Sequence, residues 1–572
     1  MTGYELSIYS STPTIIWILI EICFFIGIIL IIHQLITLQY KQNSFWLVGF
    51  FLMIITRINL LIIPYNRGYY TWSGDNITHL GLIKDIVLSG SIGDNNFYPI
   101  THILLSEIEL VSNASVQIVN YSTTLISITF IFSIFLLSRY LFSDKKIGII
   151  AVTALSGVLF NQYEVFLMPN GWSVLFIPLT TYFILRSVLE KNFSFSILAL
   201  IFLIIFPLFH PLSALILIFL LMIFVVTNYI FNIHTIAKKE KRSINKTLSI
   251  YIALLTTIFI FWILTFTNFF QRNIRELFDA LLSGGRISEG GDSQVLLEIT
   301  TKLNKADVHG IDVIILFLKM YGDDLIFLTV FIIGSIICFF YWKKLKNYAM
   351  IFSISLFTFF LGVIYCFSLL NIIPGLENIG SQRFLAYMVI FTPIYMAAAY
   401  SFFEERLQYT GRTIIVSLIV IAIIISNASL FISPYVNRPT NDVTTYDVSG
   451  MTWIIENKDV SILHANTISS ISRFADAILG SRASKLREDI NKNAPNAPDH
   501  FGYDKNPFLG NYYNSDRYLT TTQLDTIIYS TVYKSVGRFN NSDFFRLSNY
   551  DDSVDRIYDN GECKSFYINT LS

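Results

Sequence analysis

The chain has 572 residues, of which 53% are hydrophobic and 14% are charged, and its formal net charge is zero. Soluble domains average about 25% charged residues, so this composition excludes an ordinary soluble protein and indicates a membrane protein. The net charge does not identify a partner, because the charges are segregated along the chain, and no nucleic-acid partner is expected. The four cysteines form neither a disulfide framework nor a CxxC metal pattern.

Apolar segments recur along the first three quarters of the chain. A membrane-spanning helix needs about 20 mostly apolar residues. Twelve segments approach or reach that length: 15–36, 45–63, 117–138, 147–163, 172–189, 194–209, 212–232, 248–269, 323–341, 348–370, 383–401 and 412–432. The chain is therefore predicted to be an α-helical polytopic membrane protein with about 12 transmembrane helices.

Basic residues fall in alternate connections between these segments. They cluster around positions 41, 139–146, 186–191, 238–246, 343–346 and 406–412, whereas the short loops 161–171, 210–211 and 371–382 contain no Lys or Arg. The positive-inside rule makes the first set cytoplasmic. The protein is then expected in the cell membrane with both termini extracytoplasmic, together with the loops 64–116 and 270–322. The glycine-containing loop 270–322 is either a lid or a linker.

The composition becomes polar after Ser433-Pro434. Residues 1–435 are therefore predicted to form the transmembrane domain and residues 436–572 an extracytoplasmic soluble domain. The patterns in that domain predict helices over 447–457 and 467–479 and strands over 460–465, 526–529 and 564–568. This indicates a small α/β domain. It contains no nucleophile elbow, P-loop or zinc-ligand spacing, so we expect it to be accessory or to contact substrate.

Two charged residues lie inside predicted spans. Glu21 and Arg57 each lie six residues in from the outer end of a span. Pairing between them would offset the cost of burying either charge in the bilayer. The simpler interpretation is a structural pair that joins the first two helices, and the other is a functional role.

The first polar segment after two spans, Trp72 to His79, holds the strongest candidate for chemistry. Ser73-Gly74-Asp75 reads as a helix start with Ser73 or Asp75 as the N-cap, and amphipathic helices are expected over 76–89 and from Pro99 to 111. Asp75 and His79 are four residues apart and share a helix face.

Asp75 has three possible roles. It could only cap the helix. A carboxylate beside lipid and aromatic rings is also a stronger base, which suits deprotonation of a hydroxyl. It could instead bind a divalent cation, Mg²⁺ or Mn²⁺, together with Asp94 or Glu164, although no DxD or ExD motif is present here.

Other outer positions add candidates for substrate binding. His210-Pro211 breaks a helix at the outer boundary, so His210 either faces substrate or is a water-facing cap. Arg383 opens a span from the outer side and could bind a phosphate in a bidentate manner or extend its charge to the membrane surface. The expected substrate-binding residues are His79, Asp94, Tyr98, His102, Glu164, His210, Gln382 and Arg383.

This layout resembles the C superfamily of membrane glycosyltransferases (GT-C), in particular the archaeal and bacterial members that use polyprenyl-phosphate sugars. The features that carry the resemblance are Gly74-Asp75 just past a span, two surface helices after it, many spans and a soluble outer C-terminal domain. The resemblance implies a GT-C-like fold, Asp75 as the catalytic base and Arg383 as a ligand of the lipid phosphate. The chain departs from it in having a single Asp in place of an acidic pair and two spans before the loop. It also lacks the WWDYG-type signature, which argues against an oligosaccharyltransferase.

The expected function is that of a hexosyltransferase-type glycosyltransferase of the cell envelope, with an inverting mechanism. It would move a sugar from a polyprenyl- or dolichyl-phosphate donor to a lipid, glycan or protein acceptor on the outer face of the membrane. The alternative is a transporter or flippase of a lipid-linked glycan. That class usually places ionisable groups near the bilayer midplane and shows repeated halves.

Overall fold

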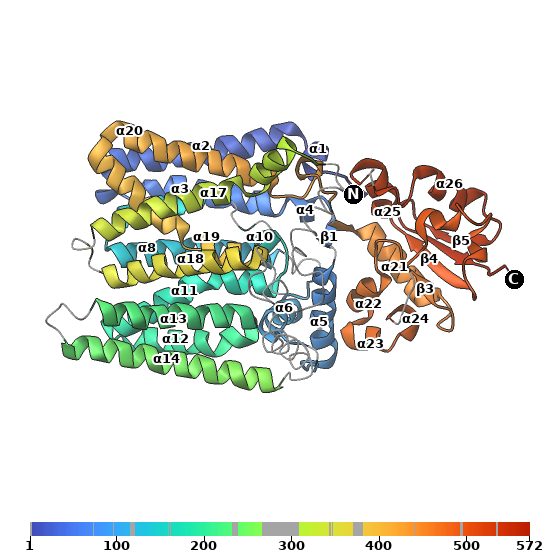
Figure 1. Ribbon diagram of the computed structural model, residues 1–572, viewed down its shortest axis with the longest axis horizontal. Helices are drawn as coiled ribbons and strands as arrows, with labels where there is room; N and C mark the ends of the chain where they lie inside the picture. The colour runs from blue at the N-terminus through green and yellow to red at the C-terminus, as the bar shows by residue number, and fades with distance from the viewer. Residues whose placement is uncertain are drawn as a thin grey trace.

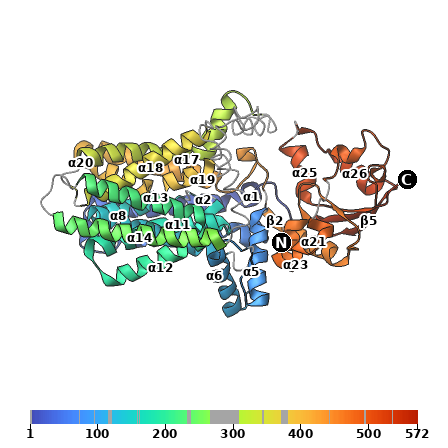
Figure 2. The ribbon, with the colours of Figure 1, turned by 60° about the horizontal axis from the view of Figure 1, so that its bottom comes forward.

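The protein consists of a bundle of long helices and a smaller domain that contains a β-sheet (Figure 1). The computed structural model describes residues 3–72, 74–94, 96–114, 121–157, 160, 162–231, 238–265, 308–341, 345, 347–369, 381–440, 442–491, 496–533 and 536–571. The smaller domain lies at one end of the bundle. Helices α5 (Asp75–Ser89) and α6 (Pro99–Ser112) lie at the same end, between the two bodies (Figures 1 and 2).

The bundle confirms a multi-pass helical membrane protein. Among the described residues, eight helices are long and apolar enough to cross a membrane, and two shorter apolar helices accompany them. The main helices are α2 (Thr14–Ile36), α3 (Trp46–Leu61), α8 (Ser122–Phe142), α11 (Pro169–Glu190), α12 (Phe193–Phe209), α13 (Pro211–Ile230), α14 (Lys238–Thr265), α17 (Ile311–Phe340) and α18 (Tyr348–Leu369). The short helices α1 (Ile8–Ser11) and α4 (Ile63–Asn66) lie at the end that carries the smaller domain.

Four predicted spans differ from the observed helices. Instead of a span over 147–163, α9 (Lys145–Ala154) has only 10 residues, which is about 15 Å or half the hydrocarbon core. The predicted span 323–341 belongs to α17, which begins at Ile311 after Gly310, a residue with φ of 59°. The predicted spans 383–401 and 412–432 correspond to α19 (Ser381–Val389) and α20 (Thr392–Ser429), and α20 is kinked at Gln408. Most of the predicted loop 270–322 lies outside the described residues.

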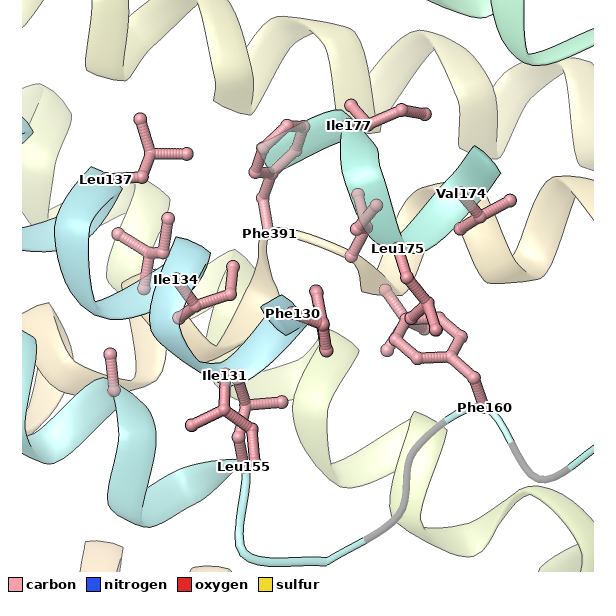
Figure 3. Packing of buried hydrophobic residues seen from close by; sticks show 14 of the residues in the cluster. Phe130, Ile131, Ile134, Leu137, Leu155, Phe160, Val174, Leu175, Ile177 and Phe391 are labelled. Atoms are coloured by element: carbon pink, nitrogen blue, oxygen red, sulfur yellow. The ribbon is translucent and has the colours of Figure 1, made fainter. Parts of the chain in front are cut away.

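The interior of the bundle is packed by side chains at helical spacing. On α8, Phe130, Ile134 and Leu137 recur every three or four residues and are fully buried. Leu155 and Phe160, which follow α9, belong to the same buried cluster (Figure 3). Other members of this cluster shown in the figure are Ile131, Val174, Leu175, Ile177 and Phe391. The rings of Phe130 and Phe160 meet edge to face at 5.4 Å, so the segment after α9 is fixed against α8.

The smaller domain contains a four-stranded sheet in the order β3-β4-β6-β5. In this sheet β3 and β4 are parallel and the other neighbours are antiparallel. The strands are β3 (His464–Ala465), β4 (Arg517–Thr521), β5 (Val554–Asp559) and β6 (Lys564–Ile568). The helices are α21 (Thr445–Asn457), α22 (Ile471–Leu479), α23 (Ser481–Lys485), α24 (Glu488–Asn491), α25 (Gln523–Thr531) and α26 (Asn541–Asn549).

One strand prediction in this domain is wrong. Residues 526–529 lie inside α25, where a strand was expected from the sequence Thr-Ile-Ile-Tyr. A capping box starts the helix, since the Thr522 hydroxyl accepts from the Asp525 amide and the Asp525 carboxylate accepts from the Thr522 amide. Only one face of the segment, at Ile528, is then buried, so the β-branched residues are accommodated in a helix.

A second, two-stranded sheet links the two bodies. Strand β1 (Tyr69–Trp72) leads into α5, and it pairs antiparallel with β2 (Asp442–Thr444) at the start of the smaller domain. Tyr69 lies opposite Thr444, and Thr71 lies opposite Val443. The strand that precedes α5 is therefore held by backbone hydrogen bonds to a distant part of the chain.

Candidate active site

Asp75 is the first residue of α5 and is not its N-cap. Gly74 occupies the cap position with φ of 80°, a conformation that favours glycine, and no side chain among the described residues caps the helix. The expectation that Asp75 caps α5 is therefore wrong. Its carboxylate is 72% exposed, and one of its oxygens lies 2.9 Å from the guanidinium of Arg473. An acidic residue in the first turn also favours the helix through the macrodipole.

His79 and His102 form a hydrogen-bonded pair beside Asp75. The Nδ1 atom of His79 lies 3.0 Å from Nε2 of His102, and Nδ1 of His102 lies 2.7 Å from Oδ1 of Asn96. With the Asn96 amide in this orientation, its oxygen must accept from His102, and His102 Nε2 must then accept from His79. The Nε2 atom of His79 is left as a hydrogen-bond acceptor.

Burial keeps this histidine pair uncharged near neutral pH. It lowers the pKa of His79 to about 4, an effect that the negative charge of Asp75 opposes and the positive charge of Arg473 reinforces. Burial and the neighbouring His79 also hold the pKa of His102 well below its ordinary value. The pair can therefore orient a hydroxyl or accept from it without adding a positive charge to the site.

Tyr98, His210 and Arg383 lie around the same end of the bundle. The ring of Tyr98 stacks on that of His210 with centroids 5.0 Å apart. Burial raises the pKa of the Tyr98 hydroxyl, and the charges of Arg383 and Asp75 act on it in opposite directions. Tyr98 therefore feels the charges of both Arg383 and Asp75.

His210 and Arg383 each have a polar group that is available to bind a ligand. His210 lies between α12 and α13, and its buried Nδ1 has no hydrogen-bond partner among the described residues. Arg383, on α19, is exposed. Its charge also acts on Tyr163 and Tyr387. A buried imidazole without a partner and an exposed guanidinium together suit an oxygen-rich ligand.

A buried hydrogen-bond network supports this end of the bundle. The Asn170 amide donates to the Tyr163 hydroxyl at 2.9 Å, and the Tyr387 hydroxyl donates to Asn170 Oδ1 at 3.2 Å. Ser213 lies 2.6 Å from Tyr387 and from Ser173. These contacts join α11, α13 and α19, the helix that also carries Arg383. The sequence shows no pattern that predicts them, because the partners come from segments that are far apart in the chain.

Glu164 belongs to the scaffold, contrary to its expected role in substrate binding. Its buried carboxylate forms an ion pair with Arg57 and accepts from Ser127. Arg57 also donates to the carbonyls of Leu155 and Gly157 at 2.6 and 2.7 Å. The predicted pair between Arg57 and Glu21 is also wrong, because Glu21 accepts from Asn427 at 2.8 Å.

The residues present do not fit a metal site. Within the described ranges no group of three or more His, Cys, Asp or Glu side chains could hold a metal ion. Of the three carboxylates considered for Mg²⁺ or Mn²⁺, Asp75 is engaged by Arg473 and Glu164 by Arg57. Asp94 is exposed in the turn before α6. No step of the chemistry is therefore assigned to a metal.

Sequence reasoning located part of this site and missed other parts. It selected Asp75 and the three histidines, but it missed Asn96 and Arg473. Asn96 lies only six residues before His102 in the sequence, and this short separation could have identified it as a neighbour. Arg473 comes from the other domain and has no local signal. Gln382 is the second residue of α19, beside Arg383, and its side chain lies outside the described residues.

The sequence and the fold were each compared with those of known proteins. No family model matches the sequence, and no curated protein sequence matches it. The Archaeoglobus fulgidus oligosaccharyltransferase in its apo form matches with a TM-score of 0.50 at 11% identity, over 86% of this chain and 71% of that chain. The chain has the fold of this oligosaccharyltransferase. The GT-C-like fold expected from the layout is thereby confirmed.

Two further solved structures show the same kind of likeness. AglB from Archaeoglobus fulgidus, in complex with an inhibitory peptide and a dolichol-phosphate, matches with a TM-score of 0.49 at 11% identity, over 83% of this chain and 70% of that chain. ArnT from Cupriavidus metallidurans bound to undecaprenyl phosphate matches with a TM-score of 0.41 at 10% identity, over 92% of this chain and 98% of that chain.

Proposed function

We propose that the protein is a membrane glycosyltransferase that moves a sugar from a polyprenyl- or dolichyl-phosphate donor to an acceptor on the outer face of the membrane. The observation that carries the proposal is the gathering of an exposed carboxylate, Asp75, with Arg383, Tyr98 and three histidines at one end of the bundle. The shared fold with an oligosaccharyltransferase supports transfer of a glycan group. On the outer face nucleotide sugars are absent, so a lipid-linked donor is expected.

In the proposed reaction Asp75 acts as the general base. The acceptor hydroxyl attacks the anomeric carbon of the donor sugar and passes its proton to the Asp75 carboxylate. The bond between the anomeric carbon and the phosphate oxygen breaks, and the electron pair leaves with the polyprenyl phosphate. Attack opposite the leaving group inverts the anomeric centre. The exposure of Asp75 gives an acceptor access to its carboxylate.

Arg383, His210 and His79 bind the phosphate, the sugar and the acceptor hydroxyl in this reaction. Arg383 binds the phosphate and stabilises the charge that develops on it as the bond breaks. The unpartnered Nδ1 of His210 is available to a phosphate or sugar oxygen. The free Nε2 of His79 accepts a hydrogen bond from a sugar or acceptor hydroxyl, which orients that hydroxyl toward Asp75.

The direct test is sugar transfer in proteoliposomes from a labelled polyprenyl-phosphate hexose. Asp75→Asn should lower the transfer rate by about 10²- to 10⁴-fold, the usual contribution of a general base. Glu107→Gln is the matched control, because Glu107 is an exposed acid on α6 outside the proposed site, and this variant should keep the wild-type rate. Wild-type turnover by Asp75→Asn would remove Asp75 from the chemistry.

A further inference from the structure

Helix α22 of the smaller domain packs against α5 (Figure 1). The two backbones approach closely at Gly81, where an added Cβ would lie 2.3 Å from the carbonyl oxygen of Asp476. No residue with a side chain fits there without moving one helix. The contact therefore fixes the distance between the domain and the helix that begins with Asp75.

Polar contacts follow one face of α5 from its first turn to its last. Arg473 binds Asp75 and Thr78 in the first turn, and the Thr78 hydroxyl donates to Asp476 at 2.9 Å. Near the other end the Lys84 ammonium donates to the carbonyl of Ile478, and the carboxylate of Asp85 accepts from the Arg482 amide at 3.1 Å. The positions on α5 have the spacing of one helix face.

Two guanidinium nitrogens of Arg473 contact the first turn of α5, which contains Asp75. Nη2 lies 2.9 Å from Oδ1 of Asp75, and Nη1 donates to the Thr78 hydroxyl at 2.8 Å. Thr78 is itself held by Asp476, one turn after Arg473 on α22. The guanidinium is therefore fixed at two points, and it orients one carboxylate oxygen of Asp75 while the other stays available.

We propose that Arg473 is a positioning residue for Asp75, and that the C-terminal domain thereby completes the active site. This inference rests on the proposed function. The pair is too exposed, at 42% for Arg473 and 72% for Asp75, to contribute much to stability. Its consequence is geometric, because a base that can rotate freely spends less time aligned with the acceptor hydroxyl.

The test compares two arginines of the same domain in the transfer assay. Arg473→Ala should lower kcat by about 10- to 100-fold and leave the KM for donor and acceptor within about twofold, because misplacing a catalytic group chiefly affects the chemical step. Arg473→Lys should recover part of kcat, since it keeps the charge and loses the second contact. Arg482→Ala is the control. Its side chain contacts Ser89 and Ser91 at the far end of α5, and its amide, which binds Asp85, is retained.

The outcomes separate this inference from the proposed function. If Asp75→Asn keeps wild-type activity, the proposed function fails at Asp75 and the positioning role fails with it. If Asp75→Asn is inactive while Arg473→Ala keeps the wild-type kcat, the proposed function stands and the positioning role is overturned. An equal loss of kcat in Arg473→Ala and Arg482→Ala would also overturn it, because the effect would then come from loosened domain contact.

Discussion

The chain contains two arginine–carboxylate pairs with similar chemistry and opposite surroundings. Arg57 and Glu164 are 1% and 0% exposed and lie inside the bundle, where Arg57 also binds the carbonyls at the end of α9. Arg473 and Asp75 are 42% and 72% exposed and lie between the two domains. The same pairing therefore serves as scaffold in one region and leaves a reactive group accessible in the other.

Burial accounts for the difference. A buried ion pair is stable only while both partners and their hydrogen bonds are present, since removing one leaves an uncompensated charge away from water. An exposed pair is screened by water and contributes about 0–1 kcal/mol. A carboxylate locked in a buried pair cannot take a proton from substrate, whereas an exposed one held by a single contact can. The contrast supports Asp75, and not Glu164, as the base.

The largest expected effect is on the buried pair. Glu164→Gln should destabilise the protein by about 3–5 kcal/mol, because Arg57 is left buried without a counter-charge. The measurement is unfolding of the purified protein in mixed detergent micelles. Glu190→Gln, which breaks a partly exposed pair with Arg186, is the matched control and should cost at most about 1 kcal/mol. Equal losses in the two variants would contradict the role of burial.

A double variant sharpens this prediction. Replacing both Arg57 and Glu164 by Met removes the isolated charge, so it should recover part of the stability lost in Glu164→Gln. The recovery should be incomplete, because the carbonyls of Leu155 and Gly157 lose their donor. Full recovery would show that these two hydrogen bonds contribute nothing to the fold.

The same pair explains a limit of prediction from sequence. Hydropathy located most of the bundle, and Pro99 correctly marked the start of α6 because its fixed φ suits a first helical position. Hydropathy could not show that α9 stops at Ala154, because the carbonyls beyond it are satisfied by an arginine from another helix. Both Arg57 and Glu164 were recognised as charges, but their pairing depends on how α3 and α8 pack around the segment after α9.

The candidate site was predictable where its residues are close in sequence. Asp75 and His79 share a helix face, and His102 follows in the next helix, so local spacing was informative. The pairing of Arg473 with this helix spans 395 positions, counted from Thr78, and comes from docking of the C-terminal domain. No periodicity or motif near Arg473 indicates that contact, and only the packing of α22 on α5 reveals it.

An intermediate effect is expected from the histidine pair beside Asp75. A folded-state pKa of about 4 for His79 lies below its ordinary value of 6.5, so the unfolded chain binds more protons between these values. The stability that neutral His79 provides is therefore present above pH 6.5 and is lost as the pH falls toward 4. From pH 7.5 to pH 5 the loss should be about 2 kcal/mol, because the unfolded chain is largely protonated at this histidine at pH 5 while the folded protein is not.

The variant His79→Asn distinguishes the contribution of His79 to the pH dependence of stability from that of other titrating groups. His79→Asn retains a donor toward His102 and cannot titrate in this range. Burial raises the pKa of Asp442 and of Asp447 to about 7, and these carboxyls change stability with pH in the opposite direction in both proteins. The difference in unfolding free energy between wild type and His79→Asn should thus shrink on acidification. A difference that stays constant with pH would contradict a buried, neutral His79.

The smallest expected effect is on the exposed pair. Asp75→Asn and Arg473→Ala should each change the unfolding free energy by no more than about 0.5–1 kcal/mol, because water screens the charges in the folded protein and replaces their contact when it is lost. Thermal unfolding in detergent measures this, with Glu164→Gln as the destabilised reference. A loss of stability comparable to that reference would make the Asp75 pair structural. If stability is unchanged while transfer is lost, the pair of Asp75 and Arg473 acts in catalysis and not in folding. The buried pair of Arg57 and Glu164 is expected to act in folding.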